Sequence, residues 1–101
     1  MTKTAASQVN EDMDRLAELV DHRGGRMLWV RHRDGRWYHA HVLVSLFDDT
    51  ELQLNWGGPV RARGGSATVI LNGLDTSERR RMLRRLCQRR AWHGYVRCDA
   101  G

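Results

Sequence analysis

The fold of this chain is decided by residues 36–57, which read RWYHAHVLVSLFDDTELQLNWG. Apolar and polar side chains alternate along both halves of this stretch, and Asp48, Asp49 and Thr50 separate the halves as a turn. A period of two residues places successive side chains on opposite faces of a strand. We therefore expect antiparallel strands at 36–47 and 51–56.

The alternation also predicts which face of each strand packs against the core. In the first strand the core face is expected to hold Tyr38, Ala40, Val42, Val44 and Leu46. The opposite face holds Trp37, His39, His41, Leu43 and Ser45. In the second strand the apolar side holds Leu52, Leu54 and Trp56.

Outward from this hairpin, the flanking sequence predicts a larger antiparallel sheet. Residues 26–32 read as a strand that joins the next one through Asp34-Gly35, a dipeptide typical of tight hairpins. Residues 57–65 hold four glycines and the only proline, which is a loop composition. Residues 66–72 read as a fourth strand, and residues 95–98 are expected as a short edge strand.

Two helices are expected towards the ends of the chain. Residues 1–9 are small and polar and are expected to be flexible, whereas 10–24 show apolar spacings of three and four, with Asn10 as the N-cap. A second helix is expected to begin near 74–78 and to run to about Trp92. The predicted fold class is α+β: a twisted antiparallel sheet of four or five strands, a C-terminal basic helix packed on one face, and an additional N-terminal acidic helix at the edge.

The composition limits the class of protein. With 101 residues, 41% hydrophobic and 29% charged, the chain holds enough apolar surface for one core and one domain. No apolar run approaches the ~20 residues of a membrane span and no leader segment is evident, so we expect a soluble, cytoplasmic protein without a membrane partner. Cys87 and Cys98 are too few for a disulfide framework and are expected to be reduced.

Basic charge is concentrated in the C-terminal half of the chain. Residues 1–57 hold seven cations and nine acids, whereas 58–101 hold ten cations and three acids, within a net charge of +5. Seven arginines fall between positions 79 and 90. The apolar stripe of this second helix is expected to be Met82, Leu83, Leu86 and Cys87. The opposite face is expected to carry Arg80, Arg81, Arg84 and Arg85.

Like charges four residues apart destabilise a helix, so an anion is expected beside these arginines. Three interpretations stay open. The anion is a nucleic-acid backbone, whose phosphates gain free energy by counterion release; or it is the acidic N-terminal helix folded back; or the arginines are simply a solvated face.

A second cationic element is the loop after Trp56. An aromatic ring, flexible glycine backbone at Gly57 and the side chains of Arg61 and Arg63 have the chemistry to hold a nucleotide through sugar or base and phosphate. The alternative is a glycine-rich connection between strands, with Trp56 buried in the core.

Trp37, His39 and His41 form a possible interaction face on the side of the sheet away from the core. Two histidines at this spacing present two imidazoles to a metal, but no third ligand is evident, so we expect a solvated or partly buried pair. No nucleophile elbow, phosphate-binding loop or paired metal motif is present. We therefore expect a non-enzyme without a cofactor or metal.

The order of these motifs resembles the WGR domain, a family of small bacterial proteins and of modules in eukaryotic poly(ADP-ribose) polymerases. The matching features are Trp37-Tyr38, Leu46-Phe47, Trp56-Gly57, Gly64-Gly65 and the final Trp92, Gly94 and Tyr95. The resemblance covers about residues 27–97 and implies a WGR-like domain at 26–99.

In the polymerases the motif's Trp and Arg engage the end of a broken DNA strand. The resemblance therefore implies that Trp56 lies against a terminal sugar. Gly58 stands where the family has its arginine. Either Arg61 or Arg63 replaces that arginine, or strand-end recognition is lost and only the scaffold is kept.

These observations predict a non-enzymatic module that binds DNA, or RNA, without base specificity. The expected contact residues are Trp56, Gly57, Arg61, Arg63, Arg80, Arg81, Arg84 and Arg85. The alternative is a protein-interaction or regulatory module, in which the basic helix docks an acidic protein or the face around Trp37, His39 and His41 docks a second copy.

Overall fold

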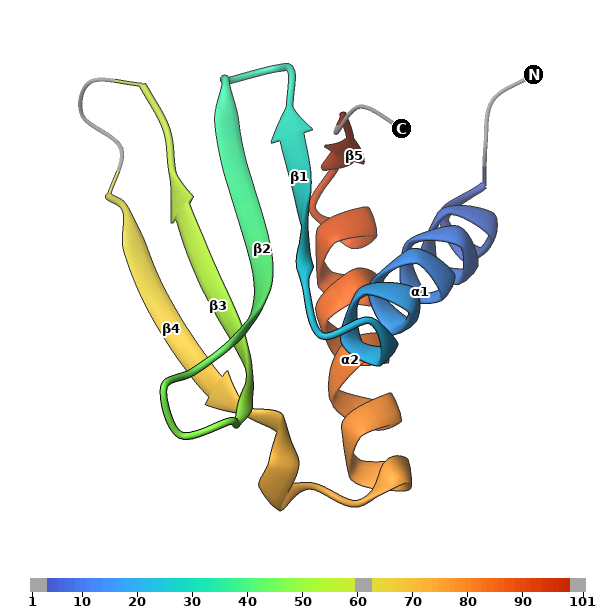
Figure 1. Ribbon diagram of the computed structural model, residues 1–101. Coiled ribbons are helices and arrows are strands. Elements are labelled where there is room, and N and C mark those ends of the chain that lie inside the picture. Colours follow the sequence, from blue (N-terminus) through green and yellow to red (C-terminus); the bar gives the residue numbers. More distant parts are fainter. Residues whose placement is uncertain (1–3, 60–62, 99–101) are drawn as a thin grey trace.

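A computed structural model describes residues 4–59 and 63–98 as a five-stranded antiparallel sheet with two helices (Figure 1). The strands lie in the order β4-β3-β2-β1-β5. The elements are α1 (Ala5–Asp21), β1 (Gly25–Arg31), β2 (Arg36–Val44), β3 (Thr50–Gly57), β4 (Gly65–Ile70), the short 3₁₀ helix η1 (Leu71–Gly73), α2 (Thr76–Trp92) and β5 (Val96–Arg97). The predicted α+β fold is confirmed, with the sheet at its upper count of five strands.

Both helices pack on one face of the sheet, and the core lies between them and β1 to β3. The predicted core face of β2 is confirmed for Tyr38, Ala40 and Val42, which are buried. Val44 is 42% exposed and Leu46 fully exposed, so their assignment to the core is wrong. The strand ends at Val44, and Ser45 opens a turn that carries the following residues beyond the reach of the helices.

The N-terminal helix begins earlier than predicted. Its N-cap is Thr4, whose hydroxyl accepts a hydrogen bond from the Ser7 amide at 3.1 Å, and Asn10 lies within the second turn. The helix ends at Asp21, so the predicted span of 10–24 is shifted, and residues 5–9 are helical rather than flexible. Val9 explains the difference, because its buried side chain holds the first turns against the core.

One acid of α1 points inward. The carboxylate of Asp12 is 3% exposed and accepts a hydrogen bond of 2.9 Å from Nε1 of Trp29, on β1. The guanidinium of Arg97, on β5, lies 4.0 Å from the same carboxylate. Asp12 therefore does not belong to the acidic solvent face that the sequence pattern predicts, because a charged side chain with these two partners is stable inside the protein.

The C-terminal helix agrees with the sequence prediction. Asp75 caps it by accepting a hydrogen bond of 2.8 Å from the Glu78 amide, and Leu83 and Cys87 are its buried residues. Burial, with the nearby charge of Asp12, raises the pKa of the Cys87 thiol to about 12. Cys87 and the exposed Cys98 are both free thiols.

Replacing Asp12 with Ala is expected to lower the free energy of unfolding by about 1–3 kcal/mol, because the buried Trp29 Nε1–H then has no acceptor. Urea denaturation measures the change. The matched control is Asp14→Ala, an exposed residue of the same helix, which is expected to change stability by less than about 0.5 kcal/mol. Equal effects of the two substitutions would contradict a structural role for the buried carboxylate.

Candidate nucleic-acid interface

A cationic hollow of about 440 Å³ opens between the end of α2 and the adjoining ends of β1, β2 and β3. Its lining combines four guanidinium groups with aromatic rings and, among the described residues, holds no carboxylate. The residues are Arg31, Arg36, Tyr38, Trp56, Arg89, Arg90, His93 and Tyr95. We call this set the cationic hollow. Trp56 is the one sequence-predicted site residue that it contains.

Two of these arginines come from the β1–β2 hairpin, where Arg31 and Arg36 are cross-strand partners. Like charges placed opposite each other destabilise a sheet. Asp34 offsets one of them, because its carboxylate lies 2.7 Å from Arg31 and this contact lowers the pKa of Asp34. The Arg36 amide donates to the Asp34 carboxylate at 3.2 Å, and among the described residues its guanidinium donates one hydrogen bond, of 3.3 Å, to the carbonyl oxygen of Arg63. Its charge is therefore available to a ligand.

The last turn of α2 contributes the other two cations. The Arg90 guanidinium lies 3.8 Å from the centre of the Tyr38 ring and 5.2 Å from that of Tyr95. Its Nε is buried without a hydrogen-bond acceptor in the described residues, and burial lowers the pKa of the group. Within the same described part of the chain, Arg36, Arg89 and Arg90 form no ion pair. An anion in the hollow would meet partly desolvated, unneutralised charge.

Trp56 is half-buried, and both faces of its indole ring are covered. One face stacks on Tyr38, with ring centroids 5.7 Å apart and planes 8° from parallel. The other lies over Gly65, where an added Cβ would be 2.5 Å from Trp56 Cζ2. In this arrangement Tyr38 and Gly65 occupy the space that a base stacked on the ring would need, which favours contact through the edge of the ring. The ring edge in the hollow suits contact with a sugar.

Gly57 and Arg63, the other described residues of the predicted loop site, do not gather around Trp56. Gly57 is buried beneath Trp37 on the opposite face of the sheet, where an added Cβ would be 2.7 Å from the Trp37 ring. Arg63 is exposed, and its side chain is not part of the hollow. Arg61 lies outside the described residues.

The four predicted arginines of α2 are exposed, but they do not share one face of the helix. Arg80 and Arg84 line cavities beside α1, whereas Arg85 lies on the β3 and β4 side. In the described chain none of Arg80, Arg81, Arg84 and Arg85 forms an ion pair. Arg85 adjoins the hollow, because Arg85 and Arg89 are one helical turn apart, about 6 Å along the axis. We call the four arginines the strip; it wraps around the exposed side of α2 from the α1 flank to the cationic hollow.

The acidic helix α1 screens this strip only at a distance. Asp14 and Asp21 line a cavity of about 350 Å³ between the helices, together with Arg79 and Arg80. In the regions described, neither Asp14 nor Asp21 forms an ion pair with an arginine of α2. A deletion of residues 1–24 would remove the acids of α1 together with Leu16, Leu19 and Val20. Because these three residues are buried in the core, the deletion would destabilise the fold as well as remove the charges.

The predicted set did not include Arg31, Arg36, Arg89 and Arg90. One signal was present in the sequence, since Arg31 and Arg36 flank the Asp34-Gly35 turn closely enough to be cross-strand neighbours. Arg89 and Arg90 belong to the run of arginines in the sequence, but their proximity to the hairpin depends on where α2 crosses the sheet. Local patterning does not determine that crossing.

Trp37, His39 and His41 lie together on the face of the sheet that carries no helix. The two imidazole rings are 6.1 Å apart, and the pairing register surrounds them with Arg26, Gln53 and Asn55. No group of three or more metal-binding side chains occurs in the part of the chain that the structure describes. Leu28 and Val30, the β1 partners of His39 and Trp37, lie on the same face, so this surface is of mixed polarity.

Comparisons with known proteins found no match that informs on this site. No protein-family model matches the chain, and neither a curated protein nor a solved structure matches it. The WGR resemblance therefore stays a prediction from the motifs alone. In the described residues, neither helix is long and apolar enough to cross a membrane.

Replacing Gly65 with Ala is expected to displace the Trp56 ring and to destabilise the protein by about 1–3 kcal/mol, the usual cost of an extra methyl in a packed site. Urea denaturation and the tryptophan near-ultraviolet circular dichroism measure the two effects. Gly73→Ala is the control, because an added Cβ there meets nothing within 4 Å. A Gly65→Ala variant as stable as the control would show that Trp56 does not cover Gly65.

Stability is expected to fall as the pH drops below about 6.5, in part because of His39. Burial, the neighbouring His41 and Arg26 lower the pKa of His39, so the unfolded chain takes up a proton that the folded protein does not. A His39→Gln variant should lose less stability than wild type between about pH 7.5 and pH 5.5, measured by urea midpoints. His32→Gln, in an exposed turn, should follow wild type.

Proposed function

We propose that this protein binds the sugar-phosphate backbone of nucleic acid without catalysis and without base readout. The observation that carries the proposal is the cationic hollow, in which Arg36, Arg89 and Arg90 lie beside Trp56 with no neutralising carboxylate in the lining. Planar guanidinium groups match the geometry of phosphate, and a nucleic-acid backbone presents phosphates at regular intervals.

The strip along α2 extends the same chemistry beyond one phosphate. Arg80, Arg81, Arg84 and Arg85 are exposed, and Arg85 leads into the hollow through Arg89. A backbone that follows the strip neutralises several cations in succession and releases its condensed counterions. No side chain in this set is placed to read a base edge specifically, so the proposal covers DNA and RNA alike.

The test is fluorescence anisotropy with labelled blunt duplex, nicked duplex, single-stranded DNA and RNA. Binding is expected to weaken steeply between about 50 and 200 mM salt. The double substitution Arg36→Gln with Arg89→Gln is expected to weaken binding by about tenfold or more and to lower the salt slope by about two, because two phosphate contacts are lost. Preference for the nicked or blunt duplex would support strand-end recognition.

The matched control is Arg26→Gln with Arg33→Gln, which removes the same charge from two exposed sites outside the hollow. We expect this pair to change affinity by less than about threefold, since only the long-range field is altered. Equal losses in the two double variants would contradict a localised site. A response to salt that is flat would exclude nucleic acid, and retention of an acidic protein in its place would favour the protein-interaction alternative.

A further inference from the structure

The turn between β2 and β3 presents two large apolar side chains to solvent. Leu46 is fully exposed and Phe47 is 87% exposed. Val44 and Ile70 are also exposed at this end of the sheet, but on opposite faces, because their partners Thr50 and Glu51 are adjacent in β3. An isolated exposed apolar residue is ordinary, but an adjacent exposed Leu and Phe form a pair of the kind that binds a partner. We call residues 45–49 the tip.

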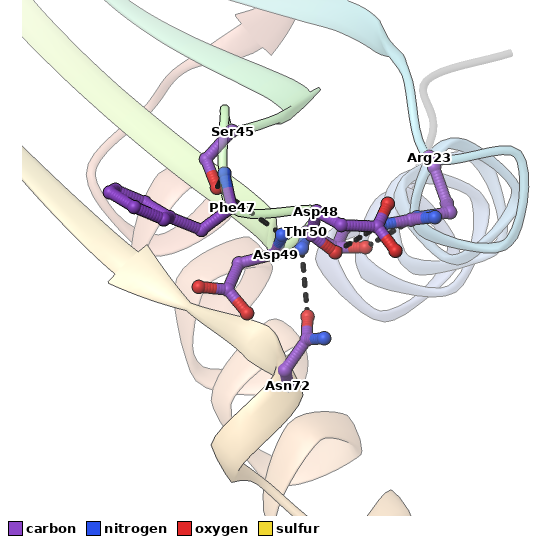
Figure 2. Close-up of polar contacts among 7 residues, drawn as sticks. All are labelled: Arg23, Ser45, Phe47, Asp48, Asp49, Thr50 and Asn72. Atoms are coloured by element: carbon purple, nitrogen blue, oxygen red, sulfur yellow. Dashed lines mark hydrogen bonds and ion pairs between the residues drawn. The ribbon is translucent and has the colours of Figure 1, made fainter.

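The tip is held rigidly (Figure 2). The Ser45 hydroxyl accepts hydrogen bonds from the amides of Phe47 and Asp49, each at 3.2 Å. Arg23, after α1, donates to the backbone oxygen and the carboxylate of Asp48, at 2.6 and 3.0 Å. In Figure 2 the Phe47 ring projects away from the turn, on the side opposite Arg23. Exposure of Phe47 is thus a fixed feature of the turn.

The same turn is also anchored to the strand that follows it. Thr50 donates its amide to Oδ1 of Asn72 at 2.7 Å, and its hydroxyl accepts from Nε of Arg23 at 2.9 Å. Two segments far away in sequence therefore hold this turn: Arg23 contacts Asp48 and Thr50, and Asn72 contacts Thr50. A preorganised apolar group loses little conformational entropy when it enters a partner's pocket.

Charge narrows the chemistry of that partner. Asp48, Asp49 and Glu51 follow Phe47 closely in sequence, and residues 44–53 contain no Lys or Arg. Arg23 pairs with Asp48, so Asp49 and Glu51 give the tip its negative charge. This charge disfavours a phosphate backbone as the ligand of the tip. The pocket that fits it is apolar and bordered by cations.

The protein carries such a pocket itself. A groove of about 180 Å³ runs between α2 and the strands β3 and β4. A cavity of about 150 Å³ is enough to hold benzene, so the groove has room for one phenyl ring. Its apolar lining is Leu52, Leu54, Val69, Met82 and Leu86, and its cationic border is Arg85, Arg89 and Arg90, with Tyr38 at one end. We call this set the α2 groove.

We infer that the tip of one copy docks head-to-tail into the α2 groove of a second copy, with Phe47 among the apolar side chains and Asp49 near Arg85 and Arg89. Such a contact uses different surfaces on the two copies, so it is heterologous and leaves a free tip and a free groove at the ends of each assembly. The inference does not depend on nucleic-acid binding.

Sedimentation velocity of the full chain without nucleic acid, from low micromolar to near-millimolar protein, is the test. The average mass of wild type is expected to rise with concentration, less so at high salt. Phe47→Asp, which disables the tip, should weaken association by about 30-fold or more, as expected for the central residue of an interface. Arg85→Glu, which reverses one charge at the groove, should also leave a monomer.

Mixing the two variants gives the decisive result. The Arg85→Glu copy keeps its tip and the Phe47→Asp copy keeps its groove, so the mixture should form a one-to-one dimer and nothing larger. Trp92→Asp, at an exposed aromatic outside both surfaces, is the control and should associate like wild type. Circular dichroism verifies that each variant is folded.

Three outcomes would overturn the inference. Wild type that stays monomeric at every concentration would assign the tip to a different macromolecule. Association that survives Phe47→Asp would point to another contact, such as pairing of the exposed edge strand β4. A mixture of the two folded variants that remains monomeric, at a concentration where wild type is associated, would show that the α2 groove does not receive the tip.

Discussion

The arrangement of both helices depends on one buried carboxylate. Asp12 accepts the Trp29 indole hydrogen bond, approaches Arg97 and adds to the rise in the pKa of Cys87. It thus lies where α1, α2, β1 and β5 meet. A buried charge that loses its partners is strongly destabilising, so this junction tolerates little relative movement of the four elements. It fixes α1 beside α2 on the β1 and β5 side of the sheet.

This asymmetry leaves room for the two proposed surfaces. Figure 1 shows α1 on one side of α2 and the strands β3 and β4 on the other. The α2 groove lies between α2 and these two strands. The cationic hollow lies at the end of α2, against β1, β2 and β3. The hollow then gathers cations from two sources that have no relation in sequence. The hairpin brings Arg31 and Arg36, and the last turn of α2 brings Arg89 and Arg90.

The sequence predicts the elements much better than the site. Alternation identified the buried face of β2, and the Asp75 cap and the apolar stripe through Cys87 identified α2. These features are local, with periods of two or about 3.6 residues. The start of α1 was missed because the Thr4 cap is followed by only one early core contact, Val9, ahead of the main apolar pattern.

The site depends on long-range geometry. Trp56 was predicted as a contact residue and lies in the lining of the cationic hollow, but its neighbours Tyr38 and Gly65 reach it only through the strand register. Gly57 was chosen as its neighbour in sequence and lies on the other face of the sheet, because adjacent residues of a strand point in opposite directions. Their position in the sequence alone does not show that Trp56 faces the hollow and Gly57 faces away from it.

The two proposed surfaces share residues, and this sharing has a physical consequence. Arg89 and Arg90 border both the α2 groove and the cationic hollow, which also have Tyr38 in common. A carboxylate of the tip and a phosphate would then compete for the same guanidinium groups, because an arginine that pairs with one anion is not available to the other. A nucleic-acid backbone carries many negative charges and a tip only a few. At low salt, nucleic acid is therefore expected to bind these arginines more tightly than a tip does. Head-to-tail contacts and backbone binding would therefore exclude each other at this end of α2, and the ionic strength would set the balance between them.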